Sequence, residues 1–485
     1  MPIRLFILCC TRVDACRELR SHMASGGSED GLPNPLPPEL GIHIEAYASV
    51  TQYPTMKWRL PPSKSHLIRA MALYSQSNQA VKLFNATQSG EDARAMRSCL
   101  EQLGVSFSDF SQDGTRLSSN HPQSSYWLMQ GVGINGFRLP KEPLNAMNSG
   151  TTLRILACLA ARLSGQIVLD GDASLRRRDS SFLWDSLRLA GVRVSSPEGD
   201  EHLPVTVEGP WSPEKLVEGV ELDVSGSSQA LSSWMLASAA LPHPVELKLL
   251  GEGVSNRHAE LTRNMVESLG GRISYQDEVC RLEPFTLSSV SDYTVPGDAS
   301  MAAFAMLASR CMNFGVELIN WPNERDSIGH EVLKSNSIEV GVQWSEGHLH
   351  PHADGHYFHI DLKDANDLLP PMAALMALAS GGRISGASHA ALKESNRLQR
   401  TVDVLACFGV KATVHDDGIE VVSGQELRRP LAPVAVYGDH RLFMTAVLLA
   451  SKTGGVIAGP ALHTVADEGF LSRLIQAGIQ IMDRD

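Results

Sequence analysis

Residues 59–71 read RLPPSKSHLIRAM, and this stretch shows the pattern on which the whole chain is built. Its two prolines end an extended segment, because proline cannot continue a hydrogen-bonded ladder. A mostly apolar helix is expected to follow, interrupted within its body by Arg69. Ser63, Lys64 and Ser65 stand at its start, where backbone N–H groups have no partner inside the helix. The stretch therefore predicts a buried helix whose first turn can receive an anion.

Six copies of one pattern follow each other along the chain. Each copy has a mostly apolar helix, a short strand, an amphipathic helix and then a glycine that suits the end of that helix. These glycines are Gly104, Gly191, Gly270, Gly341, Gly409 and Gly478, separated by 87, 79, 71, 68 and 69 residues. A repeat of roughly 70–85 residues is longer than the roughly 20–50 residues of common solenoids. We therefore expect two globular units of three repeats, each with buried helices surrounded by sheets.

The elements of each copy can be located in the sequence. The buried helices would be LIRAMALYS, LRILACLAA, LSSWMLASAAL, MAAFAMLAS, PPMAALMALAS and LFMTAVLLAS. The strands that follow them would be AVKLFNA, QIVLDG, VELKLLG, VELINW, GRISGA and GVIAGP. Strands that alternate with helices in this way predict an α/β protein.

The composition is that of a globular protein and excludes several functions. Of the 485 residues, 43% are hydrophobic and 20% are charged. The formal net charge is −12 and no dense run of lysine and arginine occurs, so nucleic-acid binding is not expected. No segment approaches the roughly 18 apolar residues of a membrane span. Residues 1–41 include a stretch rich in glycine, proline and serine, and we expect them to form a loose extension.

The eight cysteines suggest reduced thiols in a cytoplasmic protein. They form no CxxC pair and no cysteine–histidine cluster with the spacing of a zinc site, so the sequence implies no metal. The motif GxxxxGK[ST] of P-loop nucleotide enzymes is also missing from the sequence.

The starts of the six buried helices are small, polar and rich in glycine: SKSHLIR, NSGTTLR, SGSSQAL, PGDASMA, NDLLPPM and YGDHRLF. Any one of them can be an ordinary helix cap. Arg69 and Arg154, however, lie in otherwise buried helices, where an unpaired charge is costly. A bound phosphate or carboxylate would compensate them, and so would an internal aspartate or glutamate. Together with Lys64 and Arg441, these arginines favour an anionic ligand.

Seven short motifs, in this order, resemble the enolpyruvyl transferases and among them the EPSP synthases. The motifs are PPSKSHLIR, NSGTTLR, GDASLRRR, SGSSQ, PGDAS, LKESNR and YGDHR, and the resemblance covers about residues 42–485. It implies a two-domain inverse α/β prism made of six βαβαββ repeats. One domain would span residues 62–296, and the other would combine residues 42–61 with residues 297–485. Ligands would lie between the two domains.

The resemblance also implies a reaction. The enolpyruvyl (carboxyvinyl) group of phosphoenolpyruvate would pass to the 5-hydroxyl of shikimate 3-phosphate, with release of phosphate. This is a step of the shikimate pathway, which leads to chorismate and the aromatic amino acids. We expect no cofactor, no nucleic-acid or membrane partner, and a cytoplasmic monomer.

The family pattern assigns roles to particular residues of this chain. Those that would hold shikimate 3-phosphate are Lys64, Ser65, Arg69, Ser227, Ser228, Gln229, Ser255, Asp367 and Lys393. Those that would hold phosphoenolpyruvate are Lys64, Gly150, Arg178, Gln229, Arg397 and Arg441. Asp367 would take the 5-hydroxyl proton, and Glu394 would transfer a proton at the methylene carbon. Lys64 or His440 would support this transfer.

Several positions depart from the family pattern. Asp179 follows Arg178 where proline is usual, so we expect it to compete for that arginine. His258 stands where a tyrosine is common, and Asn396 stands where an aspartate is usual.

The stretch VADEGF, residues 465–470, lacks a lysine that in the family meets phosphoenolpyruvate. Asp467 and Glu468 would instead put negative charge near an anionic ligand, unless they point away.

Two other functions remain open at this point. One is transfer to another phosphorylated cyclic alcohol, and the other is anion binding without catalysis. The enzymes that act on a UDP-sugar typically place a cysteine in a mobile loop of the first domain. No cysteine occurs here between Cys158 and Cys280, which argues against that branch.

Overall fold

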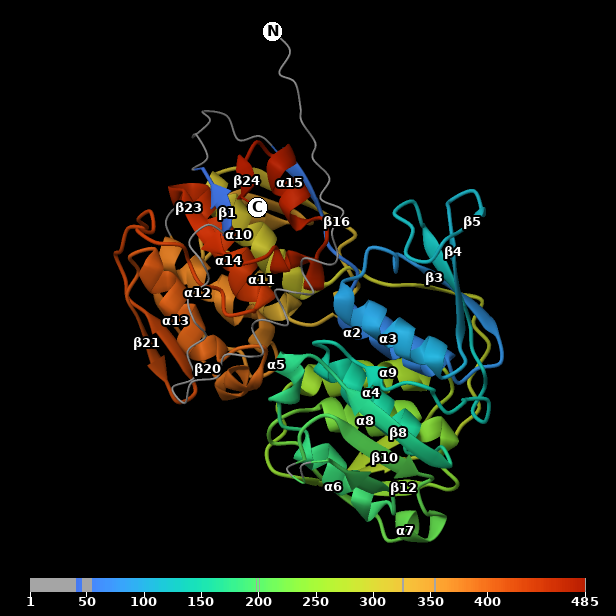
Figure 1. The fold of residues 1–485 in the computed structure, drawn as a ribbon. Helices are drawn as coiled ribbons and strands as arrows, with labels where there is room; N and C mark the ends of the chain where they lie inside the picture. Colours follow the sequence, from blue (N-terminus) through green and yellow to red (C-terminus); the bar gives the residue numbers. More distant parts are fainter. Residues whose placement is uncertain are drawn as a thin grey trace.

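The structure, a computed structural model, describes residues 41–45, 55–197, 199, 201–324, 327–352 and 355–484. They form two lobes (Figure 1). The elements from α2 (Lys64–Tyr74) to β15 (Asp292–Thr294), blue to yellow-green, make the first lobe, and those from η2 (Ala299–Met301) to β24 (Ile481–Arg484), yellow to red, make the second. The strands β1 (Gly41–Ile44) and β2 (Thr55–Arg59) belong to the second lobe. Gly41, which the sequence placed in the loose extension, therefore begins a strand, and residues 1–40 lie outside the described residues.

Each lobe contains three copies of the predicted repeat. The buried helices are α2 (Lys64–Tyr74), α4 (Gly150–Ala160), α8 (Gln229–Ala237), α10 (Ala302–Met312), α12 (Leu369–Leu378) and α14 (His440–Thr453). The amphipathic helices are α3 (Glu91–Gln102), α6 (Ser181–Leu189), α9 (Asn256–Ser268), α11 (His330–Ser335), α13 (Arg397–Cys407) and α15 (Phe470–Gln476). The six predicted glycines have φ between 73° and 105°, the left-handed conformation that glycine favours. Five of them directly follow the cap residue of their helix, whereas α11 ends at Ser335 and a turn separates it from Gly341.

Three sheets cover the first lobe. One has the order β15 (Asp292–Thr294), β3 (Ala80–Phe84), β6 (Tyr126–Gln130), β4 (Ser106–Phe110) and β5 (Arg116–Leu117). The second has β7 (Leu144–Asn145), β8 (Gly165–Asp170), β10 (Val205–Gly209) and β9 (Arg193–Ser195). The third has β11 (Val220–Asp223), β12 (Val245–Leu250), β14 (Val279–Leu282) and β13 (Ile273–Gln276).

Three sheets also cover the second lobe. One has the order β17 (Val342–Ser345), β18 (His348–Pro351), β16 (Gly315–Ile319) and β2. The second has β19 (Phe358–Asp361), β20 (Gly382–Ser385), β22 (Gly418–Val421) and β21 (Ala412–His415). The third has β23 (Gly455–Ala458), β1 and β24 (Ile481–Arg484).

The remaining helices are short. They are α5 (Ala173–Arg176), α7 (Pro213–Val217) and the 3-10 helices η1 (Ser238–Ala240), η2 (Ala299–Met301), η4 (Asn366–Leu368), η5 (Ser388–Leu392) and η6 (Leu462–Val465). Among the described residues, no helix is long and apolar enough to cross a membrane.

The strand pairing explains why the chain crosses between the lobes twice. β2 pairs in parallel with β16 of the second lobe, although α2, the next element along the chain, lies in the first lobe. β15 then pairs in parallel with β3 and completes the first lobe before the chain leaves it. The two crossings lie side by side: Ser63 N donates to Pro296 O at 2.8 Å, and Asp298 N donates to Pro61 O at 2.9 Å. The start of α2 is thus fixed at the junction of the lobes.

Each lobe has its own hydrophobic core. One cluster of buried apolar side chains comes from residues 67–295. The other comes from residues 42–60 and 301–479. These two clusters support the division into residues 62–296 and residues 42–61 plus 297–485, which stays a prediction.

Trp234 offers a test of that division. Its fully buried ring stacks on Trp211 at 5.7 Å, and its Nε1 donates to Ser186 Oγ at 3.0 Å. Trp234→Ala should lower the free energy of unfolding of the first lobe by about 3–5 kcal/mol, because it leaves a cavity in that core. In urea, the unfolding midpoint of the first lobe should move to a lower urea concentration, and the midpoint of the second lobe should not change. Trp234→Phe should lower the free energy of unfolding by less than Trp234→Ala does. One transition that moves as a whole would contradict the division.

Candidate active site

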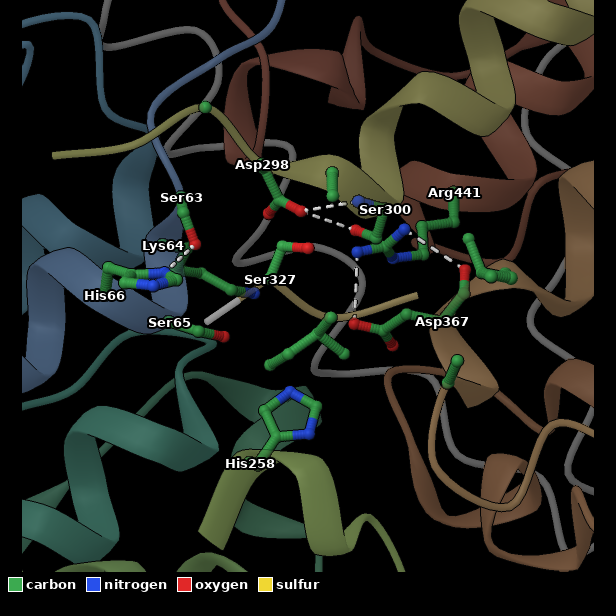
Figure 2. A pocket seen from close by; sticks show the side chains of 15 residues that line it. Ser63, Lys64, Ser65, His66, His258, Asp298, Ser300, Ser327, Asp367 and Arg441 are labelled. Carbon is green, nitrogen blue, oxygen red and sulfur yellow. Dashed lines mark hydrogen bonds and ion pairs between the residues drawn. The ribbon is translucent and has the colours of Figure 1, made fainter. Parts of the chain in front are cut away.

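A cavity lined by both lobes lies beside the two crossings (Figure 2). Its lining residues are Ser63, Lys64, Ser65, His66 and His258 from the first lobe, and Gly297, Asp298, Ala299, Ser300, Ser327, Ile328, Ala365, Asp367, Leu368 and Arg441 from the second. Its volume is about 30 Å³, whereas sites for small organic ligands hold roughly 300–1,000 Å³. Such a ligand can therefore enter only if the lobes separate or the lining side chains turn.

Arg397, the first residue of α13, is a buried guanidinium held by three carboxylates of its own lobe. Its Nε lies 2.8 Å from Asp439 Oδ2, and its Nη1 lies 2.7 Å from Asp367 Oδ1. Its Nη2 lies 2.5 Å from Glu394 Oε2. Burial would lower the pKa of Arg397, but the carboxylates outweigh burial and raise it. This cluster fixes the positions of both predicted catalytic carboxylates.

Arg441 holds Asp367 from a second direction. Its Nη2 lies 3.0 Å from Asp367 Oδ2, and its Nη1 donates to Asp367 O at 3.1 Å. Asp439 caps α14 by accepting a hydrogen bond from Arg441 N at 2.9 Å. Burial would raise the pKa of Asp367, but Arg441 and Arg397 outweigh burial and hold the pKa well below its usual range. Asp367 is therefore ionised in this arrangement.

Glu394 lies beside His440. The distance from His440 Nδ1 to Glu394 Oε1 is 4.0 Å, and His440 Nε2 is buried without a hydrogen-bond partner among the described residues. Burial lowers the pKa of His440 to about 4. Burial would raise the pKa of Glu394, but Arg397 and Arg178 hold it well below its usual range. At neutral pH the pair is a carboxylate beside a neutral imidazole.

Lys64 reaches from α2 to α3, where its Nζ lies 2.8 Å from Asp92 Oδ2. Burial would lower the pKa of Lys64, but Asp92 and two carboxylates of the second lobe outweigh burial and raise it. Those two carboxylates are Glu394 and Asp367, so the ammonium of Lys64 lies within electrostatic range of both. Lys64 thus carries a stable positive charge between the lobes.

The first lobe supplies two arginines that pair with no carboxylate among the described residues. Arg154 donates to Gln229 Oε1 and, at 2.8 Å, to the carbonyl oxygen of Asp179. Arg178 donates to Asn148 Oδ1 and to a serine hydroxyl. Burial lowers the pKa of Arg154 to about 10, and the charge of Arg178 acts in the same direction. Two neighbouring cations that form no ion pair among the described residues favour the binding of an anion.

Arg69, predicted to hold a substrate phosphate, lies behind two residues that line the cavity. Its guanidinium donates to Thr262 Oγ1 at 2.7 Å, Ser65 O at 3.0 Å, His258 O at 3.3 Å and Ser232 Oγ at 3.4 Å. Burial lowers the pKa of Arg69 to about 10. Because neutral acceptors occupy its donors, Arg69 joins α2, α8 and α9 and holds Ser65 and His258 at the edge of the cavity.

The loop before α9 carries Ser255 into contact with the second lobe. Ser255 N donates to Lys363 O at 3.1 Å, and Ser255 Oγ accepts from Asn366 Nδ2 at 3.4 Å. His389 Nε2 lies 3.5 Å from the same hydroxyl oxygen. Within the first lobe, Ser228 Oγ donates to Ser255 O at 2.9 Å. The two predicted substrate residues Ser228 and Ser255 therefore lie together, although neither lines this cavity.

The other predicted residues lie near Arg154. Ser227 Oγ accepts from Gln229 N at 3.2 Å, and a Cβ on Gly150 would lie 2.8 Å from Arg154 Nη1. Lys393 has no hydrogen bond or ion pair among the described residues, and burial lowers its pKa. The predicted residues thus gather where the lobes meet, with Lys64, Ser65, Asp367 and Arg441 at the cavity itself.

The expectation that Asp179 competes for Arg178 is wrong. The Asp179 carboxylate accepts from Ser181 N at 2.8 Å, at the start of α6. Its backbone oxygen is taken by Arg154. Asn396, the other polar departure nearby, caps α13 by accepting from Gln399 N at 3.2 Å.

The acidic residues of VADEGF are both engaged by arginines. Asp467 pairs with Arg473 of α15, and Glu468 pairs across the lobes with Arg94 of α3 at 2.5 Å. Their charges are therefore partly compensated, so they would repel an anionic ligand less than the sequence alone indicated.

Sequence reasoning missed the carboxylate partners of the predicted cations. Asp92 lies in the first turn of an amphipathic helix, where acidic residues are common, so its pairing with Lys64 had no distinct signal. Asp439, in the helix start YGDHRLF, caps α14 and also binds Arg397.

The family model described as EPSP synthase (3-phosphoshikimate 1-carboxyvinyltransferase) matches residues 55–470. A protein of Methanosphaera stadtmanae named 3-phosphoshikimate 1-carboxyvinyltransferase is 27% identical, over 84% of this chain and 96% of its own length. One of the same name from Methanothermobacter thermautotrophicus is 28% identical, over 87% of this chain and 96% of its own length.

Solved structures share the fold. The EPSP synthase of Acinetobacter baumannii is 22% identical with a TM-score of 0.70, and the match covers 91% of this chain and all of that one. The enolpyruvyl transferase NikO from Streptomyces tendae is 14% identical with a TM-score of 0.67, over 91% of this chain and 99% of that one. These similarities confirm the predicted α/β fold, and the match of the family model confirms the resemblance drawn from the seven motifs. The chain belongs to the EPSP synthase family.

Proposed function

We propose that this chain transfers the enolpyruvyl group of phosphoenolpyruvate to the 5-hydroxyl of shikimate 3-phosphate and releases phosphate. It would thus serve the shikimate pathway to chorismate and the aromatic amino acids. One observation carries the proposal: Arg154 and Arg178 of the first lobe form no ion pair among the described residues, and Arg178 acts electrostatically on the ionised Glu394 of the second lobe. Cations for anionic substrates and carboxylates for proton transfer therefore meet at one place. We also propose that the enzyme acts as a cytoplasmic monomer.

The two substrates together carry two phosphates and two carboxylates, so the site must supply several cations. Shikimate 3-phosphate is held by Lys64, Ser65, Ser227, Ser228, Gln229, Ser255, Asp367 and Lys393. Phosphoenolpyruvate is held by Lys64, Gly150, Arg178, Gln229, Arg397 and Arg441. We add Arg154, because its charge is unpaired and lies near that of Arg178. Arg69 contributes by holding Ser65 in place.

The reaction is an addition followed by an elimination. The 5-hydroxyl oxygen attacks the central carbon of phosphoenolpyruvate while the methylene carbon gains a proton. The adduct then loses phosphate as the new methyl group gives up a proton. Asp367 takes the hydroxyl proton, Glu394 moves the proton at the methylene carbon, and Lys64 and His440 adjust the local charge.

The arginines must release the carboxylates before these can exchange protons. In the arrangement seen here Arg397 and Arg441 keep the pKa of Asp367 far too low for a general base. When phosphoenolpyruvate takes over contacts of these arginines, its negative charge raises the pKa of Asp367 and of Glu394. The substrate would thereby prepare the acid–base groups that act on it.

A second candidate is transfer to another phosphorylated cyclic alcohol. It is favoured by His258, which lines the cavity with its buried Nδ1 unpaired among the described residues. Burial lowers the pKa of His258 to about 3, so its imidazole is neutral and can bind a hydroxyl. Such a group in place of a tyrosine could select a different ring.

The first test is release of inorganic phosphate by the purified chain. Release should require both phosphoenolpyruvate and shikimate 3-phosphate. Faster release with another phosphorylated cyclic alcohol would support the second candidate. Tight binding of shikimate 3-phosphate without any release would overturn both and indicate a non-catalytic anion-binding protein.

Asp367→Asn tests the general base. Turnover should fall by about 10²–10⁴-fold, because the amide cannot accept the hydroxyl proton. The dissociation constant for shikimate 3-phosphate, measured by calorimetry, should change only a few-fold. Asp298→Asn is the matched control, since Asp298 lines the same cavity but accepts from Ser300 N at 3.0 Å and has no proposed proton role. Near-normal turnover of Asp367→Asn would refute the assignment.

Proton uptake tests the proposed change in carboxyl pKa. Because the pKa of Glu394 is now well below its usual range and should rise when phosphoenolpyruvate binds, the bound state holds more protons than the free state. Affinity for phosphoenolpyruvate should therefore increase as pH falls from about 8 to about 6. Calorimetry in buffers of different ionisation enthalpy measures the uptake. Glu394→Gln should reduce it, and equal uptake in that variant would contradict the mechanism.

Gly90 tests whether turnover needs the lobes in contact. A Cβ on Gly90 would lie 1.9 Å from the carbonyl oxygen of Val465 in the other lobe, although its φ of −68° suits alanine. Gly90→Ala should hold the lobes apart and lower turnover by about 10²-fold, with little change in the thermal midpoint. Gly226→Ala is the control: its Cβ would meet no atom within 4 Å, so turnover should not change. Unchanged turnover in Gly90→Ala would mean that catalysis does not need this contact.

A further inference from the structure

A second cavity, of about 510 Å³, lies in the first lobe beside the loop that carries Ser255. Its volume falls within the range of sites for small organic ligands. The loop supplies one side of it, and strand β12 and helices α8 and α9 supply others. Its apolar lining consists of Val224, Leu231, Leu249, Val254 and Ala259. An apolar group of a ligand would therefore be stabilised here.

Arg263 of α9 is the cation that lines this cavity. Among the described residues it has no ion pair, and its Nε is buried without a hydrogen-bond partner. Glu260, which also lines the cavity, is already paired with Arg257 at 2.8 Å. A partly buried guanidinium with an unused N–H is suited to a carboxylate, which it can bind through two hydrogen bonds.

Glu278 lines the same cavity from the turn between β13 and β14. Its carboxylate forms no hydrogen bond or ion pair among the described residues, and the residue is exposed. It acts electrostatically on Lys248, whose own ion pair is with Glu221. Tyr275, from the adjacent strand, adds an aromatic ring to the lining. With Glu260 already paired, Arg263 and Glu278 are the charged lining residues that form no ion pair among the described residues. Such a lining disfavours a phosphate or a dicarboxylate and fits a ligand that carries one charge of each sign.

We propose that this cavity binds a zwitterionic amino acid with an apolar side chain. The ligand carboxylate binds Arg263, the ammonium group binds Glu278, and the side chain packs against the apolar lining and Tyr275. This cavity shares Ser228 with the residues proposed to hold shikimate 3-phosphate, and none of its other lining residues has a proposed role in holding either substrate.

The loop beside the cavity connects this site to the contact between the lobes. Ser228 lines the cavity and donates to Ser255 O, while Ser255 N donates to Lys363 O of the second lobe. Asn256 also lines the cavity, and its N donates to Asp364 Oδ1 at 2.6 Å. An occupant that fits the cavity in this arrangement stabilises the arrangement in which the loop contacts the second lobe. It should therefore strengthen binding of shikimate 3-phosphate, a consequence that rests on the proposed function, whereas the binding itself does not.

The test is calorimetric titration of the full chain with L-phenylalanine as the probe. 3-Phenylpropionate lacks the ammonium group and phenethylamine lacks the carboxylate, so both should bind at least about tenfold more weakly. Arg263→Gln and Glu278→Gln should each weaken L-phenylalanine by about tenfold or more. Arg281→Gln is the matched control, because Arg281 lies on β14, pairs with Glu246 at 3.0 Å and does not line the cavity.

The thermal unfolding midpoints of the variants should match that of the parent chain. Weaker binding by a variant is then not caused by loss of its folded structure. No binding of L-phenylalanine to the parent chain, or equal binding to Arg263→Gln, would overturn the proposal. Equal affinity for 3-phenylpropionate would overturn the assignment to a zwitterion. Because the titration needs no turnover, its failure can be told apart from failure of the proposed reaction. If L-phenylalanine binds, the dissociation constant for shikimate 3-phosphate should fall in its presence and stay unchanged in Arg263→Gln.

Discussion

A guanidinium that is buried must be matched by negative charge, and Arg397 imposes this condition on the second lobe. Asp367, Glu394 and Asp439 reach it from three separate places in the chain. Breaking a buried ion pair on one side typically costs about 3–5 kcal/mol, because the remaining charge is left uncompensated. The cluster therefore ties η4, the start of α13 and the start of α14 together. It places two carboxylates at the contact between the lobes with little freedom to move.

The arginines of the site have different partners in the two lobes. In the second lobe, Arg397 and Arg441 are neutralised by carboxylates of the same lobe. In the first lobe, Arg154 and Arg178 use only neutral acceptors. A chain with a net charge of −12 thus concentrates unpaired positive charge on one side of its site. An anionic ligand has most to gain there, and closing the lobes then brings it to the carboxylates that act on it.

The local pattern of the sequence predicted the repeats because the signals are local. A left-handed glycine after an amphipathic helix and an apolar helix before a strand need no knowledge of distant contacts, and all six copies are present. The seven motifs likewise identified the starts of the buried helices. The partners of the charged residues depend on tertiary structure instead. Asp179 and Asp92 each lie near a predicted cation, yet only Asp92 forms an ion pair with one.

The partners of Arg69 could not be predicted from the sequence either. Its place in a buried helix indicated an internal partner or a ligand, but periodicity cannot tell which way a long side chain turns. The structure turns it toward Thr262 and Ser232, so that its charge is spread over hydroxyl and carbonyl oxygens. Neither cavity could be foreseen, because each is lined by residues from elements far apart in the chain.

The ion pairs that join the lobes around the site are weak enough to break when the lobes separate. In the part of the chain that the structure describes, three ion pairs cross between them: Arg94 with Glu468 at 2.5 Å, Arg257 with Glu331 at 2.6 Å, and Lys363 with Glu252 at 3.3 Å. All three are partly exposed, and pairs of this type contribute about 0–1 kcal/mol each. Together they align the lobes without locking them. The free energy that holds the site closed during a reaction must therefore come from the ligand. That dependence suits a cavity of about 30 Å³, which has to open before any substrate can enter.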